Sequence, residues 1–156
     1  MKALLKQLQA DFPSVVFEAS SQFYWSPKDR VVYYDPCKNT VKARWALLHE
    51  LSHGLLGHTT YKSDFELLQL EVAAWKQSRE VASAYGIGID EEHVQDCLDT
   101  YRDWLHARST CPTCTEHGLQ NAQGLYNCLN CNSQWNVSKA RFCRPYRRSA
   151  TEKNSK

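Results

Sequence analysis

Residues His49-Glu50-Leu51-Ser52-His53 form an H-E-x-x-H motif inside a segment of helical pattern. Residues four apart on an α-helix are separated by about 40° around the axis and one turn along it, so both imidazoles can converge on one zinc ion. Glu50 lies about 100° from His49, outside the ligand pair but within reach of a metal-bound water. The motif therefore predicts a zinc metalloprotease, a hydrolase with His49 and His53 as metal ligands and Glu50 as the general base.

A catalytic zinc ion takes three protein ligands and a water, so a third ligand must come from elsewhere. His58 lies about 140° from the second motif histidine on a continuous helix, and we expect it to interact with helix-end carbonyls instead. The metzincin pattern would have a third His where this chain has Thr59. Within the following helical segment, Glu71 stands among apolar residues, where a carboxylate is costly unless a metal or a partner compensates it. We therefore predict Glu71 as the third ligand, with Glu66 and Glu80 as alternatives.

Seven cysteines, an odd number without an export signal, favour reduced thiols over disulfides. Four of them form two Cys-x-x-Cys pairs separated by thirteen residues, namely Cys111, Cys114, Cys128 and Cys131. Four thiolates at this spacing close a tetrahedral zinc site with no open position, which predicts a structural zinc ion in a zinc ribbon. So short a module has too small a core to fold unaided, and metal binding would supply its folding free energy. We expect ordinary reduced thiols at the other three cysteines, Cys37, Cys97 and Cys143.

The motif and the helix that follows it also resemble a known family. HELSHGLLGH, followed after a short loop by LEVAAW, is similar to the ImmA/IrrE-type metallopeptidases, and the resemblance covers about residues 30–89. It implies a gluzincin-like zinc site of His49, His53 and Glu71, with Glu50 as the base. It also implies endoproteolysis of an intracellular regulatory protein such as a repressor. The family usually has Asn or Asp shortly after its Ala, where this chain has Trp75.

Two further functions stay open at this point. The order of an H-E-x-x-H helix and a zinc ribbon resembles the SprT-like proteases, which act on DNA-bound proteins but use a later His as third ligand. The other alternative is a non-catalytic adaptor whose ribbon binds nucleic acid or protein. The intact Glu50 argues against the adaptor, because a purely structural metal site has no use for a carboxylate beside the metal.

Charge is unevenly distributed along the chain. The net charge is +2, yet seven of the 19 basic residues and only one of the 17 acidic residues follow Ser138. Aromatic and basic residues that alternate around the ribbon predict a nucleic-acid-binding surface, with Trp135, Arg141, Arg144, Arg147 and Arg148 as candidates. The alternative is that Trp135 packs the small core of the ribbon and the arginines are solvated. We thus expect a protein substrate and a nucleic-acid partner, but no membrane.

The elements that must position these residues follow from hydrophobic periodicity. It predicts helices over 2–10, 41–57, 65–85 and 91–107, and short strands over 15–17, 22–25 and 30–34. The fold class is therefore α+β, a small antiparallel sheet with helices carrying the H-E-x-x-H motif, plus the C-terminal zinc ribbon. We divide the 156 residues into a metallopeptidase-like domain (1–108), the zinc ribbon (109–144) and a basic, flexible tail (145–156). Without a signal peptide or an apolar membrane span, we expect a cytoplasmic protein.

Overall fold

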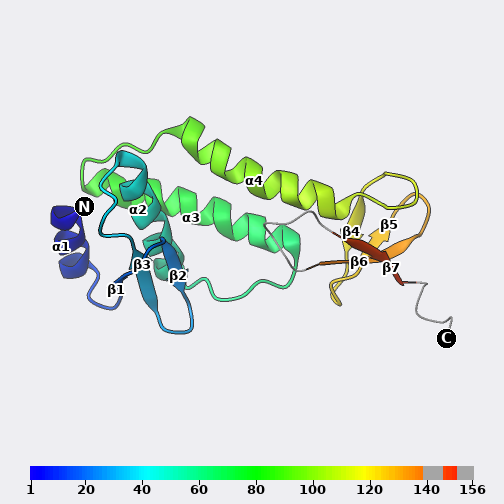
Figure 1. The fold of residues 1–156 in the computed structure, drawn as a ribbon, viewed down its shortest axis with the longest axis horizontal. Coiled ribbons are helices and arrows are strands. Elements are labelled where there is room, and N and C mark those ends of the chain that lie inside the picture. Colours follow the sequence, from blue (N-terminus) through cyan, green and yellow to red (C-terminus); the bar gives the residue numbers. More distant parts are fainter. Residues whose placement is uncertain (139–145, 151–156) are drawn as a thin grey trace. The chain divides into compact units, whose positions relative to one another are not determined.

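The computed structural model describes residues 1–138 and 146–150, which form an α+β fold with four helices and seven strands (Figure 1). These residues form two compact units, 1–60 with 69–95, and 61–68 with the chain from 96 onward. Two long helices contribute residues to both units. Within the described ranges, no helix is long and apolar enough to cross a lipid bilayer.

The first unit contains helix α1 (Lys2–Asp11) and a three-stranded sheet of β1 (Val16–Ala19), β2 (Tyr24–Ser26) and β3 (Val31–Tyr34) in the order β1-β3-β2. Strands β2 and β3 pair antiparallel, as expected, whereas β1 pairs with β3 in parallel, so the sheet is mixed. Residues 20–23 connect β1 to β2, which lie on opposite edges of the sheet, and β3 then returns between them. This arrangement leaves β2 as an edge strand.

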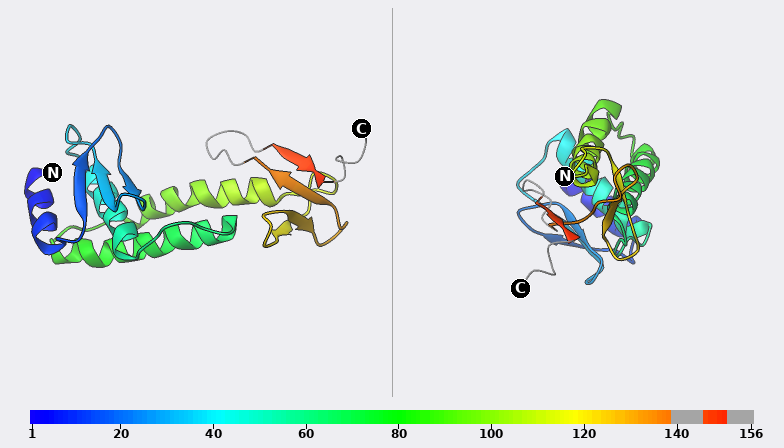
Figure 2. Two further views of the ribbon diagram at one scale, coloured as in Figure 1. Left: turned by 90° about the horizontal axis from the view of Figure 1, so that it is seen from below. Right: turned by 90° about the vertical axis from the view of Figure 1, so that its right-hand side faces the viewer.

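Helix α2 (Val41–Leu55) carries the H-E-x-x-H motif and packs against the sheet (Figure 2). Its first turn is capped by Thr40, whose side-chain oxygen accepts a hydrogen bond from the backbone N–H of Ala43 at 3.1 Å. Helix α1, strand β3 and helix α2 all contribute side chains to the apolar core of this unit. The fully buried ones among them are Leu8, Val32, Leu47, Leu48 and Leu51. The motif is therefore placed on a helix that is fixed along its opposite, apolar side.

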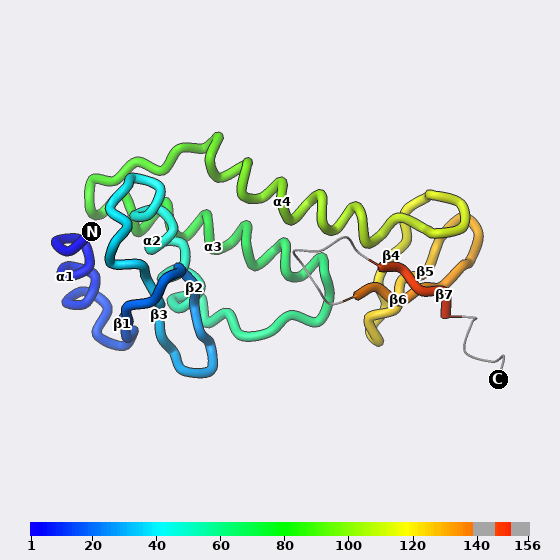
Figure 3. Tube along the Cα trace, in the orientation of Figure 1, coloured from blue at the N-terminus to red at the C-terminus, as the bar shows by residue number. Residues whose placement is uncertain are grey.

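After α2, the chain runs through residues 56–63 into helix α3 (Asp64–Ala84), and then through 85–90 into helix α4 (Glu91–Ser109) (Figure 3). Gly86, with φ +66°, ends α3 in the left-handed conformation that glycine adopts without strain. These helices were predicted from periodicity, and none of their ends differs from the prediction by more than two residues.

The second unit contains a four-stranded antiparallel sheet of β4 (Gly118–Gln120), β5 (Tyr126–Cys128), β6 (Gln134–Val137) and β7 (Arg147–Ser149). Strand β7 lies within the range predicted as a tail, yet it pairs with β6. Gly118 is required on β4, because a Cβ there would lie 2.5 Å from the ring of Trp135 and 2.6 Å from the carbonyl oxygen of Asn127. The sheet thus closes tightly over Trp135, which is fully buried.

Candidate metal centres

His49 and His53 lie one turn apart on α2, with their Nε2 atoms 3.1 Å from each other. The Oε2 atom of Glu71, on α3, lies 3.2 Å from Nε2 of His49 and 3.6 Å from Nε2 of His53. All three ligand atoms lie within 4.8 Å of one another, so this cluster can hold a metal ion. Two imidazoles and a carboxylate match the donor set of catalytic zinc sites, which keep a fourth position open.

Glu71 is buried, with 6% of its surface exposed. Burial alone would raise the pKa of its carboxyl group, but the close imidazoles of His49 and His53 outweigh that cost and hold the pKa far below its ordinary value. The two alternatives are elsewhere, since the Glu66 carboxylate accepts a hydrogen bond from the backbone of Lys62 and Glu80 is exposed. The structure therefore brings Glu71 to the two histidines and leaves the other two acids outside the cluster.

Glu50 is half-buried on α2 beside the cluster. Its Oε2 atom accepts a hydrogen bond of 2.8 Å from the backbone N–H of Trp25 on the edge strand β2. Glu50 does not belong to the group of atoms that can hold the ion. A carboxylate has a second oxygen, so this bond orients Glu50 and leaves it able to accept a proton.

His58 contacts the cluster, which the sequence prediction missed. Its Nδ1 atom lies 2.8 Å from Nδ1 of His53, on the side of that ring opposite to the ligand atom Nε2. Burial lowers the pKa of His58, and a positive charge on His53 would lower it further. The continuous helix used to exclude His58 as a partner of the cluster ends at Leu55, where the chain reverses. The expected contact with helix-end carbonyls is made by the backbone, because the N–H of His58 donates to the carbonyl oxygen of His53 at 3.0 Å.

Trp75 supports the other histidine by packing. Its ring stacks on His49 with the centroids 4.2 Å apart, and it also meets the ring of His93 edge-on at 5.8 Å. The Nδ1 atom of His49 is buried and has no hydrogen-bond partner among the described residues. The side chain at Trp75 thus fixes the plane of the His49 ring without bonding to its far nitrogen.

The second cluster lies in the ribbon and consists of the four cysteines of the two Cys-x-x-Cys pairs. Their sulfur atoms lie within 4.8 Å of one another, with 3.6 Å between Cys111 and Cys131 and 3.4 Å between Cys114 and Cys128. This group can hold a metal ion such as zinc, and with four donors it leaves no open position.

The thiols of this cluster differ in acidity. Hydrogen bonds with Ser133 lower the pKa of Cys131 to about 6. A backbone hydrogen bond at Glu116 favours the thiolate of Cys114, but burial and the neighbouring thiols outweigh it and raise its pKa to about 11. One sulfur therefore ionises readily, whereas a full set of thiolates requires a cation to offset their mutual repulsion.

The predicted nucleic-acid residues are not gathered into one surface by the described part of the chain. Trp135 is fully buried, its ring is stacked on Tyr126 at 5.5 Å, and its Nε1 donates to the carbonyl oxygen of Arg108 at 3.0 Å. It therefore packs the ribbon core, as the alternative interpretation expected, and presents no face to a base. Arg147 and Arg148 are exposed on β7. Arg141 and Arg144 lie outside the described residues.

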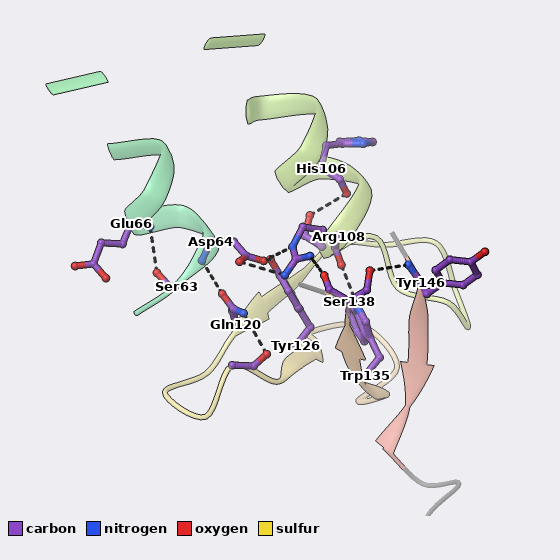
Figure 4. Close-up of polar contacts among 12 residues, drawn as sticks. Ser63, Asp64, Glu66, His106, Arg108, Gln120, Tyr126, Trp135, Ser138 and Tyr146 are labelled. Atoms are coloured by element: carbon purple, nitrogen blue, oxygen red, sulfur yellow. Dashed lines mark hydrogen bonds and ion pairs between the residues drawn. The ribbon is translucent and has the colours of Figure 1, made fainter. Parts of the chain in front are cut away.

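A buried polar network beside the ribbon sheet also escaped the sequence analysis (Figure 4). The guanidinium of Arg108 pairs with the carboxylate of Asp64, and both side chains are 6% exposed. The hydroxyl of Tyr126 donates to the same carboxylate at 2.6 Å, and the side-chain oxygen of Gln120 accepts from the backbone N–H of Asp64 at 2.8 Å. Each nitrogen of the guanidinium and each oxygen of the carboxylate therefore has a partner, as a buried pair requires, with Ser138 accepting the remaining bond from Arg108.

Comparison with known proteins yields one match among curated proteins, a histidine--tRNA ligase from Onion yellows phytoplasma (strain OY-M). It is 25% identical over 118 residues, which cover 65% of this chain and 26% of that ligase. The chain thus spans about a quarter of the length of the curated protein that it matches. No family model and no solved structure matches the chain.

Proposed function

We propose that this protein is a zinc-dependent endopeptidase that cleaves an intracellular protein, with Glu50 as its general base. The observation that carries the proposal is the convergence of the ligand atoms of His49, His53 and Glu71 within 4.8 Å, with Glu50 beside them but not among them. Metal-assisted hydrolysis of a peptide requires three protein ligands for the ion and one nearby carboxylate as the base.

Each residue then has a distinct task. The chemistry that zinc would supply at this site is a bound water with a pKa lowered toward about 7 and polarisation of the scissile carbonyl. His49, His53 and Glu71 hold the ion. Glu50, oriented by the backbone N–H of Trp25, takes the proton of the attacking water and returns it to the leaving amine.

The third ligand also bears on the choice between the protease families that the sequence resembles. SprT-like proteases need a later His, whereas the donor that meets His49 and His53 in this structure is the carboxylate of Glu71. That carboxylate supports a gluzincin-like site of the ImmA/IrrE type, with SprT-like activity as the second candidate. The exposed Arg147 and Arg148 on β7 leave a nucleic-acid partner within the proposal.

Substitutions that separate the base from the ligand test the proposal. Glu50→Gln should keep the fold and both zinc ions yet lose proteolysis of a mixed peptide library, because Gln cannot accept the proton. Glu71→Ala should lower zinc affinity itself, because it removes a donor atom. Glu66→Gln, which changes an acid outside the cluster, is the matched control and should alter neither property.

Two results would contradict the proposal. If Glu50→Gln cleaves peptides as fast as the natural protein, Glu50 is not the base. If the natural protein holds one zinc ion per chain and His49→Ala does not change that number, the first cluster is not a zinc site, and the non-catalytic adaptor becomes the better interpretation.

A further inference from the structure

The C-terminal end of α2 reverses the chain through a Schellman motif. Gly57 has φ +66°, its backbone N–H donates to the carbonyl of Gly54 at 3.2 Å, and the N–H of His58 donates to the carbonyl of His53 at 3.0 Å. The motif pairs the residue after the left-handed glycine with the residue five positions earlier. It therefore brings His58 back to His53, the second histidine of H-E-x-x-H.

The side chains of this pair meet as well as the backbones. The Nδ1 atoms of His53 and His58 lie 2.8 Å apart, a hydrogen-bond distance. The carbonyl oxygen of His58 accepts a further hydrogen bond of 2.9 Å from Nε1 of Trp25 on β2. His58 is thus held both by the helix end and by the edge strand.

This contact fits one of the two neutral tautomers of His53 when metal binding is considered. Nε2 of His53 faces His49 at 3.1 Å and Glu71 at 3.6 Å, so Nε2 is the atom that would bind the ion. A neutral imidazole that binds a metal through Nε2 carries its proton on Nδ1. His53 then donates that proton to Nδ1 of His58, which must itself be protonated on Nε2.

The other motif histidine has no equivalent bond. Nδ1 of His49 is buried without a hydrogen-bond partner in the described part of the chain, and Trp75 holds that ring only by stacking. Metal-binding histidines usually donate their second N–H to an acceptor, which fixes the tautomer and the ring orientation. Of the two, only His53 has that support here.

We propose that His58 is a positioning residue that fixes the tautomer and orientation of His53 for metal binding. This inference rests on the zinc centre in the proposed function and extends it to a residue outside the ligand set. It does not require His58 to touch the ion or the substrate.

Zinc affinity of the full chain, measured by competition with a chromophoric chelator, tests the inference. His58→Ala removes the acceptor and should weaken the His49/His53/Glu71 site about 10- to 100-fold. His58→Asn places a side-chain oxygen near the position of Nδ1 and should restore most of that affinity. The four-cysteine site serves as an internal reference and should not change, and Thr59→Ala, an exposed neighbour, is the matched control.

The outcomes separate the inference from the function on which it rests. If the natural protein binds two zinc ions and His58→Ala binds both as tightly, His58 does not position His53, while the proposed metal centre stands. Equal losses in His58→Ala and His58→Asn, with helix content unchanged by circular dichroism, would also overturn the inference, because an acceptor would then not be what matters. If the natural protein binds only one zinc ion, the proposed metal centre itself is wrong, and so is the proposed function.

Discussion

The two candidate metal centres are built in opposite ways. The four thiols come from two short Cys-x-x-Cys turns, and they share the small core of their module with Tyr126, Trp135 and Val137. The His49/His53/Glu71 cluster instead comes from two long helices whose positions are fixed by a separate apolar core. We therefore expect the first kind of centre to depend on its metal for folding, and the second kind to be placed by a fold that forms without the metal.

The number of donors also differs between the two centres, and it determines whether a centre can take part in a reaction. Four sulfur donors complete a tetrahedral shell, so the ribbon site has no position for water or substrate. Three donors would leave one position of a bound zinc ion open. Glu50 is the neighbour of His49 in the chain and accepts an orienting hydrogen bond from Trp25 on β2. The contrast predicts that damage to the ribbon centre removes structure, while damage to the helical centre removes the proposed activity and leaves the structure in place.

The largest expected effect tests the dependence of the ribbon on its metal. Cys128→Ser removes one of four donors at a position that is 2% exposed. Zinc binding contributes about 10–16 kcal/mol to the folding of small zinc modules, far more than this core can supply. We expect the variant to lose one zinc ion and the dispersed amide resonances of β4, β5 and β6 in an NMR spectrum, while the resonances of α2 persist.

Cys37→Ser is the matched control for that substitution, because Cys37 is an exposed thiol outside the cluster. It should retain both zinc ions and every ribbon resonance. A Cys128→Ser variant with an intact ribbon spectrum would break the comparison, because the ribbon would then fold without its metal.

The second prediction concerns the buried ion pair of Asp64 and Arg108, which lies in the same unit as the ribbon but contains no metal ligand. Asp64→Asn leaves the buried guanidinium without its counter-charge and also changes the acceptor of the Tyr126 hydroxyl. Breaking a buried pair from one side costs about 3–5 kcal/mol, which urea unfolding of the zinc-loaded protein would measure.

The exposed pair of Asp99 and Arg102 provides the control for this measurement. Asp99→Asn should cost no more than about 1 kcal/mol, since solvent screens an exposed pair. If Asp64→Asn costs as little as Asp99→Asn, the network adds nothing to the stability of the zinc-loaded unit.

The same contrast explains how much was readable from the sequence. The four cysteines and the two motif histidines follow local patterns, and their spacing predicts the groups in which the structure brings them together. Glu71 is distant in sequence, but a carboxylate within an apolar helical run signals compensation by a partner. The helices were predicted because their hydrophobic periodicity is long and regular.

What the sequence analysis missed depends on chain reversal or on contacts between distant segments. The contact between His58 and His53 requires the helix to end before Gly57, a signal present in the sequence as a glycine four residues after the second motif histidine. The parallel pairing of β1 with β3 leaves no such signal in strands this short. The pairing of Asp64 with Arg108 joins residues 44 positions apart, and no local pattern encodes it.

The smallest expected effect concerns the surface of the ribbon rather than its metal. With Trp135 buried, the exposed groups near the ribbon sheet that can meet a nucleic acid include Arg147 and Arg148 on β7 and the adjacent Tyr146, which is 76% exposed. Arg147 already donates to the carbonyl oxygen of Thr110 at 2.9 Å, so part of its hydrogen-bonding capacity is used. We therefore expect Arg148 to contribute more than Arg147 to any contact with phosphates.

Binding of the full zinc-loaded chain to single-stranded DNA, titrated at several salt concentrations, measures this contribution. Each lost phosphate contact should weaken binding and reduce the slope of log affinity against log salt by about 1, because one fewer counterion is released. We expect that reduction for Arg148→Ala, a smaller one for Arg147→Ala, and none for Lys42→Ala, an exposed cation on α2. If the natural chain binds but Arg148→Ala leaves its slope unchanged, β7 is not the contact surface. If the natural chain shows no salt-dependent binding, the exposed cations of β7 do not bind phosphates. The ribbon is then better interpreted as a protein-docking module.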